Sequence, residues 1–272
     1  MEVSRIGPLF VISLVLLGVV ACGNSIRVRG ELVPPWSELP ETPEDLIQRA
    51  DSVHASTRAL GDLTEAVTCL EKAQSLQNSY SVQWRLARAY RTLAQQITSK
   101  ALQRKLLRKA VQFAEMAHAT DPEKPEALEN LAAGRGVLAT LTLAPGKAVQ
   151  EGIENPAEIL VENHPEYLDG AGKRILGALY AKAPPWPAGV GDLEEGLELL
   201  KENADQFPKN PMNHFFLGEA LLRDGRDREA EGAFKTVLSA PRAGEWALIG
   251  ATYRRMARQY LRTLQEGGSE EP

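Results

Sequence analysis

The sequence is poor in the residues that build metal sites and disulfide frameworks. Its 272 residues include two cysteines, four histidines and 6% aromatic residues. Two cysteines are too few for a disulfide framework, and no H-E-x-x-H or C-x-x-C spacing occurs. The histidines are far apart in sequence: they are His54, His118, His164 and His214. We therefore expect no metal site and no cofactor.

Signatures of catalysis and of nucleic-acid binding are also missing. The sequence contains no G-x-S-x-G nucleophile elbow and no phosphate-binding P-loop. The net charge is −5, without the basic excess that meets phosphates. The basic stretch 100–110 spaces its charges three and four apart, which favours a solvated helix face over an anion or lipid-headgroup site. The stretch 192–206 is likewise an exposed acidic face. These absences disfavour an enzyme and a nucleic-acid-binding protein.

One long apolar run is present, near the N-terminus. It extends from Ile6 to Ala21 after Arg5, is short for a membrane span of about 20 residues, and fits the apolar part of a secretory signal. The sequence Val19-Val20-Ala21-Cys22 that ends it resembles a bacterial lipobox. This resemblance implies a signal peptide over 1–21, a lipidated Cys22 and a periplasmic protein. An ordinary signal or anchor with an incidental cysteine is the alternative.

The next residue bears on which membrane would hold the lipid. Gly23, rather than Asp, follows Cys22. By resemblance to enteric lipoproteins, this favours the outer over the inner membrane.

Residues 22–43 are rich in proline and polar residues and predict a semi-extended tether. Thr42 followed by Pro43, Glu44 and Asp45 is typical of a helix start, with a capping hydroxyl and acids in the first turn. From there on, apolar and small residues recur at helical spacing. We expect a helical domain over 44–266 and a disordered tail over 267–272.

The helical domain contains internal repeats. In residues 211–244, Leu217-Gly218, Leu221, Ala230 and Phe234 have the spacing of a tetratricopeptide repeat, which this segment resembles. The small residues fit a close crossing of two antiparallel helices, and Asp224-Gly225-Arg226 fits the turn between them.

Four further copies keep the same phase less regularly. They are carried by Val53, Ala66, Leu70 and Ala73; by Leu86, Ala87, Tyr90, Ala110, Ala114 and Ala117; by Leu131, Ala132, Ile153, Ala157 and Leu160; and by Leu176, Gly177, Tyr180, Gly196, Leu200 and Asn203. We predict an all-α fold, a tetratricopeptide-like right-handed superhelix of antiparallel helix pairs with about five repeats and a capping helix. Cys69 fits a small buried residue rather than a nucleophile.

The fourth of these pairs has a lengthened turn, "APPWPAGVGD" (183–192). Its prolines restrict the backbone around Trp186, and Asp192 can cap the following helix. One interpretation places Trp186 as a plug at the end of the helical stack. The other places it on a surface for a partner or ligand, because tryptophan is favoured at interaction hot spots.

Residues 176–222 and the lipobox together resemble the T-component proteins of TRAP transporter systems. The shared features are Leu-Gly in the first helix, a long Pro/Gly turn and an amphipathic second helix. The resemblance implies a periplasmic, membrane-tethered lipoprotein that contacts a solute-binding protein or its ligand. The alternative is a scaffold lipoprotein for envelope assembly, in outer-membrane protein insertion or pilus biogenesis. The oligomeric state stays open, a homo-oligomer included.

Binding by such an array is expected on the concave surface formed by the first helices. Arginines there could bind carboxylates through two parallel hydrogen bonds, and aromatic residues could anchor a partner. With Trp186, the candidate partner or ligand groove residues are Trp84, Arg88, Arg91, Arg174, Phe215 and Glu219.

Overall fold

The structure is a computed structural model that describes residues 18–21, 26–29, 39–56, 60–142, 146–240 and 247–267. The chain divides into two compact units, Met1–Leu39 and Pro40–Pro272. Cys22 and most of the predicted signal peptide and tether lie outside the described residues. The lipidation of Cys22 therefore stays a prediction.

The first unit contains two short antiparallel strands, β1 (Gly18–Ala21) and β2 (Ile26–Arg29). Gly18 lies opposite Arg29, and Ala21 lies opposite Ile26. No strand is expected here from the sequence, which predicts a signal segment and a tether over these residues.

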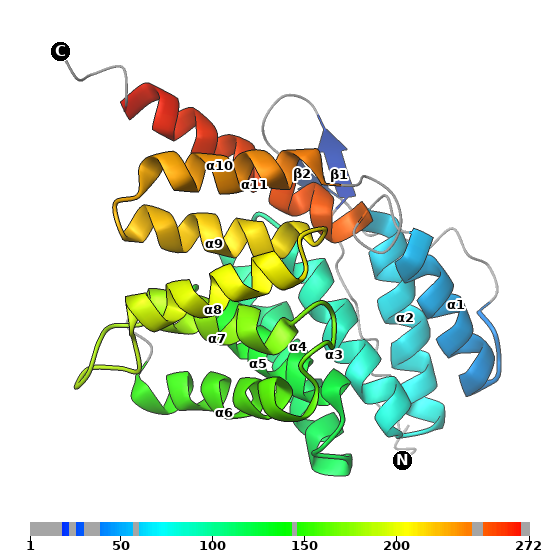
Figure 1. The fold of residues 1–272 in the computed structure, drawn as a ribbon. Helices are drawn as coiled ribbons and strands as arrows, with labels where there is room; N and C mark the ends of the chain where they lie inside the picture. Colours follow the sequence, from blue (N-terminus) through cyan, green and yellow to red (C-terminus); the bar gives the residue numbers. More distant parts are fainter. Residues whose placement is uncertain are drawn as a thin grey trace, which may run out of the picture. The chain divides into compact units, whose positions relative to one another are not determined.

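The second unit is helical in its described part (Figure 1). Its elements are α1 (Pro43–Ser56), α2 (Leu60–Leu76), α3 (Tyr80–Gln95), α4 (Lys100–Thr120), α5 (Pro125–Ala139), α6 (Lys147–Asn163), α7 (Ala171–Lys182), α8 (Leu193–Gln206), α9 (Pro211–Arg223), α10 (Asp227–Ser239) and α11 (Ala247–Gly267). Among these helices, none is long and apolar enough to span a bilayer.

Consecutive helices pack as antiparallel pairs: α1 with α2, α3 with α4, α5 with α6, α7 with α8, and α9 with α10. From α3 onward, the first helix of each pair also packs on the first helix of the next pair. Helix α11 continues this row by packing on α9 and α10. This arrangement confirms the predicted all-α superhelix of five pairs and a capping helix.

Small residues allow the helices of a pair to approach closely. A Cβ atom added to Gly196 of α8 would lie 2.8 Å from the backbone oxygen of Gly177 in α7. In the next pair, a Cβ atom on Gly218 would meet the ring of Phe234 at 2.8 Å. Larger side chains at these crossings would push the two helices apart.

Side-chain caps fix several helix starts. The backbone N–H of Asp45 donates to Thr42 Oγ1 (3.2 Å), so the predicted start of α1 is confirmed. Asp192 accepts from the backbone N–H of Glu195 (3.0 Å) at the start of α8, also as predicted. Asn210 caps α9 in the same way. These bonds satisfy donors that a helix leaves unpaired in its first turn.

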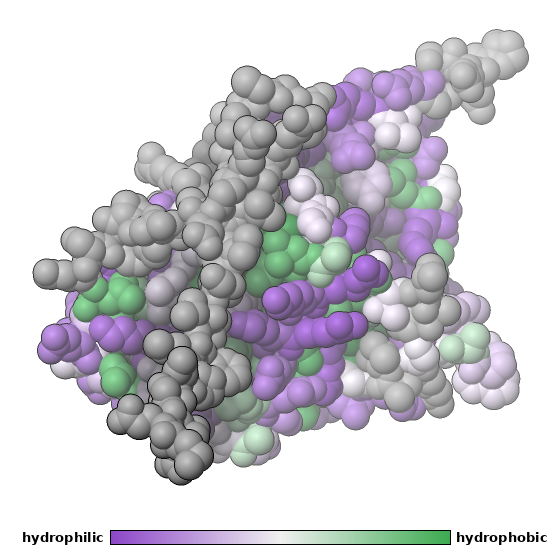
Figure 2. Space-filling model, turned by 180° about the vertical axis from the view of Figure 1, so that it is seen from behind, coloured by the Kyte–Doolittle hydropathy of each residue, from purple (hydrophilic) through white to green (hydrophobic). Residues whose placement is uncertain are grey.

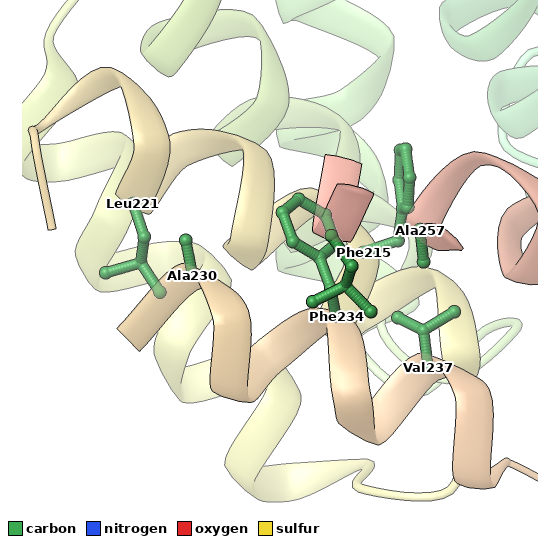
Figure 3. Close-up of a cluster of buried hydrophobic side chains, with 7 residues drawn as sticks. Phe215, Leu221, Ala230, Phe234, Val237 and Ala257 are labelled. Carbon is green, nitrogen blue, oxygen red and sulfur yellow. The ribbon is translucent and has the colours of Figure 1, made fainter. Parts of the chain in front are cut away.

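The best-defined core cluster lies between α9, α10 and α11 (Figure 3). Phe215 and Phe234 are fully buried there, beside Val237 and Ala257. The free thiol of Cys69 is also buried, and burial raises its pKa to about 11. Cys69 is therefore the small core residue that the sequence predicts.

Candidate functional site

The first candidate site is a cationic aromatic surface on α3. The guanidinium carbon atoms of Arg85 and Arg88 lie 4.2 and 4.8 Å from the ring centre of Trp84. Asp51 of α1 accepts from Arg85 Nε (2.8 Å) and from Arg88 Nη2 (2.7 Å). We call Trp84, Arg85, Arg88 and Asp51 the Trp84 face. Its two arginines share one carboxylate, so it keeps an excess of positive charge.

One turn further along α3, Arg91 extends the positive charge toward α5. Its Nη2 donates to Glu129 (2.8 Å) and to Asn130 Oδ1 (3.2 Å). The Nε atoms of Arg88 and Arg91 are buried and have no hydrogen-bond partner among the described residues. Both arginines therefore retain donor capacity after their ion pairs are formed.

A histidine from α1 lies within the field of these arginines. Burial, followed by the positive charge of Arg88, lowers the pKa of His54 to about 4. The nearby carboxylate of Asp51 opposes this shift without reversing it. His54 is therefore neutral near pH 7 and adds no charge to the Trp84 face.

Tyr167, in the connection between α6 and α7, also lies near this site. The side chain of Tyr167 interacts electrostatically with both Arg88 and Arg91. Burial, and then the carboxylates of Glu129 and Glu126, raise the pKa of Tyr167. The phenol of Tyr167 is therefore neutral and can act as a hydrogen-bond donor near Arg88 and Arg91.

The connection that carries Tyr167 has an unusual backbone. Leu168 and Asp169 have φ angles of 46° and 53°, a region that side chains other than glycine rarely adopt, and Gly170 follows at 73°. Arg174 of α7 donates to the carbonyl oxygens of Leu168 and Asp169, at 3.2 Å each. These bonds hold the strained turn in place.

Arg174 has a structural role in this arrangement. It is 5% exposed, and its Nη1 donates to Asn213 Oδ1 (2.7 Å) on α9. Asn213 Nδ2 in turn donates to the carbonyl oxygens of Asp169 (3.2 Å) and Phe207 (3.3 Å). Arg174 thus links α7, α9 and the strained turn, whereas the sequence analysis expected it to face a partner.

Phe215 also differs from its expected placement. It is 1% exposed and packs its ring against those of Phe216, Phe234 and Tyr253. Tyr253 comes from α11, which covers this part of α9 (Figure 3). The side chain of Phe215 is therefore part of the core rather than of an open surface.

Glu219 lies in a small surface pocket lined by Lys182, Leu222, Arg223 and Tyr260. Its carboxylate pairs with Lys182 Nζ (2.5 Å) and accepts from the hydroxyl of Tyr260 (2.8 Å). Both oxygens are engaged within the protein, so the Glu219 carboxylate is already paired, while Arg223 donates to the carbonyl oxygens of Ala181 (2.9 Å) and Lys182 (3.4 Å). Of the predicted first-helix residues, Trp84, Arg88 and Arg91 form one site. Arg174 interacts electrostatically with Arg91 and Glu129 but is buried and uses its donors within the protein. Phe215 and Glu219 do not join the site.

Trp186 lies apart from this site, on the connection between α7 and α8. Its side chain is 82% exposed. This exposure is incompatible with a plug in the helical stack and agrees with the interpretation as a surface residue.

The candidate residues from the sequence did not include Arg85, Asp51 or Tyr167. In the sequence, Asp51 is one of several polar residues of α1. Its role is visible only in the structure, where it accepts hydrogen bonds from Arg85 and Arg88 of α3. Tyr167 belongs to a connection, and its seven-residue stretch "HPEYLDG" carried no motif to single it out. A His-Pro followed by Asp-Gly does indicate a structured turn.

The chemistry available at the Trp84 face is that of binding. Planar guanidinium groups beside an indole can hold a carboxylate and an adjacent apolar or aromatic group. Within the described ranges, no cluster of three His, Cys, Asp or Glu side chains could hold a metal ion. Seen from behind the view of Figure 1, the coloured surface shows hydrophilic side chains around smaller hydrophobic groups (Figure 2).

Comparison with known proteins bears mainly on the fold. Residues 46–151 match the sequence profile of the family described as regulator of microtubule dynamics protein 1-3. This stretch is less than half of the chain and runs from α1 into α6. No curated relative matches the sequence.

Solved structures of repeat proteins are similar over most of the chain. TTC0263, a tetratricopeptide-repeat protein of Thermus thermophilus, aligns with a TM-score of 0.59 and 18% identity over 81% of this chain and 99% of its own. The fold is that of a tetratricopeptide-repeat array. PilF of Pseudomonas aeruginosa aligns with a TM-score of 0.50 and 14% identity over 84% of this chain and 93% of its own. At these identities the repeat array shares a fold with these proteins, and its partners must be inferred from its own surface.

Proposed function

We propose that this tetratricopeptide-repeat array is a protein-binding scaffold, held at a membrane by a lipid on Cys22, and that it binds an acidic segment of its partner at the Trp84 face. The observation that carries the proposal is the excess of guanidinium groups around Trp84. Arg85 and Arg88 share the carboxylate of Asp51, and their side chains remain 18% and 28% exposed.

The electrostatics of this surface favour an anionic partner. Two arginines stacked near an indole offer charge, planar donors and an apolar face in one place. Tryptophan and arginine are also the residues most enriched at interaction hot spots. Asp51 offsets one of the two positive charges, so a carboxylate of the partner can pair with the exposed part of the two guanidinium groups.

We further propose that the scaffold belongs to a TRAP-type solute transport system. The resemblance to TRAP transporter T-components supports a role beside a periplasmic solute-binding protein, and the lipobox supports a tether on the periplasmic side, with the outer membrane favoured. In this proposal the scaffold keeps the solute-binding protein close to the membrane. It requires no catalysis by the chain.

The anchor is tested by fractionation. The full-length chain should sediment with membranes, and Cys22→Ser should move it to the soluble periplasmic fraction, because several acyl chains on one residue anchor stably. Retention of Cys22→Ser in the membrane fraction would contradict the lipid anchor. The outcome of this test does not decide whether the Trp84 face binds a partner, which is tested separately.

The binding role is tested by capture from detergent-solubilised membranes. The wild-type chain should co-purify with a solute-binding protein, and Arg88→Glu should lose it while keeping its helical circular dichroism spectrum. Arg108→Glu, on the exposed side of α4, is the matched charge reversal and should retain the partner. Co-purification of outer-membrane insertion or pilus components instead would favour the envelope-assembly alternative.

A further inference from the structure

The tip of the α7–α8 connection is the most exposed apolar feature of the described chain. Across the described residues, the exposed large hydrophobic side chains are Leu76, Leu168 and Trp186, at 53%, 40% and 82%, and of these only Trp186 lies in the α7–α8 connection. Residues 184–188, "PPWPA", are all exposed, and none carries a charge. An exposed tryptophan among uncharged residues marks an interaction site more often than a random position does.

The base of this connection is firmly held. The backbone N–H of Gly191 donates to the carbonyl of Pro184 (2.9 Å), and that of Val190 donates to Gln150 Oε1 (2.9 Å). Gln150, on α6, is 2% exposed. The side chain of Trp186 is thus presented from a base tied to a neighbouring helix pair, so binding orders little additional chain.

A row of acidic residues on α6 begins beside this base and runs away from it. Glu154, Glu158 and Glu162 follow one face of α6 at four-residue spacing, and the hydroxyl of Tyr180 donates to Glu154 (2.9 Å). Burial and the like charges of Glu154 and Glu162 raise the pKa of Glu158.

A further acidic residue, on α8, lies within electrostatic range of the same tyrosine. Glu195, in the first turn of α8, interacts with the same Tyr180 as Glu154 and Glu158 do. In the part of the chain that the structure describes, Glu158, Glu162 and Glu195 form no ion pair. The described carboxylates near the α7–α8 connection are therefore anionic, and no ion pair among the described residues neutralises these three.

We propose that the Trp186 tip and the acidic faces of α6 and α8 form a second docking surface, for a protein with an apolar pocket edged by lysine and arginine side chains. The apolar tip fills the pocket, and the carboxylates pair with its cationic edge. Anionic lipid headgroups would be repelled by these carboxylates, which favours a protein over a membrane surface. The surface differs from the Trp84 face in position and charge, so neither proposal depends on the other.

The test begins with site-specific photo-crosslinking in cells that express the full chain. Benzoylphenylalanine is placed at position 186, and at position 205 as a control. Asp205 is exposed near the far end of α8, about 18 Å along the helix from Leu193. We expect one protein to be crosslinked from position 186 and not from position 205. Crosslinks only to lipid, or only to a second copy of the chain, would overturn the proposal.

The crosslinked protein is then purified, and its affinity for variants of the chain is measured. Trp186→Ala should weaken binding about thirty-fold or more, as expected for a hot-spot tryptophan. Glu158→Lys with Glu195→Lys should slow association and reduce its salt dependence, whereas Asp205→Lys should match the wild type.

Arg88→Glu separates the two surfaces in this assay. It should leave the affinity at the Trp186 tip unchanged while removing capture at the Trp84 face. Equal affinities of wild type and Trp186→Ala, with both helical by circular dichroism, would overturn the second docking surface alone.

Discussion

At the scale of single residues, glycines determine how closely the helices of a pair approach. A Cβ atom at Gly196 would lie 2.8 Å from the backbone nitrogen of Ala181 as well as from the Gly177 oxygen, and backbone atoms cannot rotate away. Gly196→Ala should therefore lower the free energy of unfolding by about 1–3 kcal/mol, measured by urea denaturation.

A second glycine supplies the control. Gly232 on α10 has nothing within 4 Å of an added Cβ. Gly232→Ala should raise the free energy of unfolding by about 0.5–1 kcal/mol, because alanine has the higher helix propensity. Effects of equal sign at the two positions would contradict the close crossing of α7 and α8.

His54 gives a residue-scale prediction about pH. Its folded-state pKa is lowered to about 4, below the ordinary value of about 6.5, so the unfolded chain binds a proton first on acidification. The contribution of neutral His54 to the free energy of unfolding is fully present above about pH 6.5. It is lost as the pH falls toward 4, which lowers the free energy of unfolding by about 1–3 kcal/mol. His54→Gln should flatten this part of the profile of unfolding free energy against pH. An unchanged profile would show that His54 is not buried in its neutral form.

Residue roles were predictable where the repeat phase decides them. Ala230, Phe234 and Cys69 are buried as their spacing indicates. Phe215 and Arg174 were misplaced for a different reason. The repeat spacing shows that a residue lies on the inner side of a first helix. It does not show that α11 covers Phe215 or that the turn at Leu168 covers Arg174, because these contacts come from other parts of the chain.

At the scale of elements, caps and connections explain where helices begin. Asp192→Ala removes the side-chain acceptor of α8 and should cost about 1 kcal/mol of unfolding free energy, measured by thermal or urea denaturation. Ser79, at the start of α3, makes no side-chain cap bond. Ser79→Ala should therefore change stability by less than about 0.5 kcal/mol. A similar loss for both would contradict the assigned cap.

Helix pairs were predictable from the spacing of small residues, and the α7–α8 connection was correctly placed within a pair. The two short strands in residues 18–29 were not expected, because apolar and polar segments of this length do not distinguish a signal and tether from a strand pair. The strained turn at 168–170 also escaped prediction. Contacts from Arg174, Asn203, Asn210 and Asn213, all distant in sequence or on other elements, explain why non-glycine residues adopt it.

At the scale of the whole molecule, the array connects its first helices into a continuous row that ends at α11. Gln96 Nε2 at the end of α3 donates to Thr252 Oγ1 of α11 (3.1 Å), so distant repeats meet. This contact adds to the neighbour-to-neighbour packing of a simple solenoid. Such an array presents separate surfaces in fixed positions, which is the property that a scaffold requires.

The central claim is that the Trp84 face binds a protein partner. Its most direct test is the affinity of the captured, purified partner for the wild-type chain, Arg88→Glu and Arg108→Glu, by isothermal titration calorimetry. The account predicts that Arg88→Glu weakens binding by about tenfold or more, while Arg108→Glu binds like the wild type. Equal affinities for all three, or equal losses for both charge reversals, would contradict it.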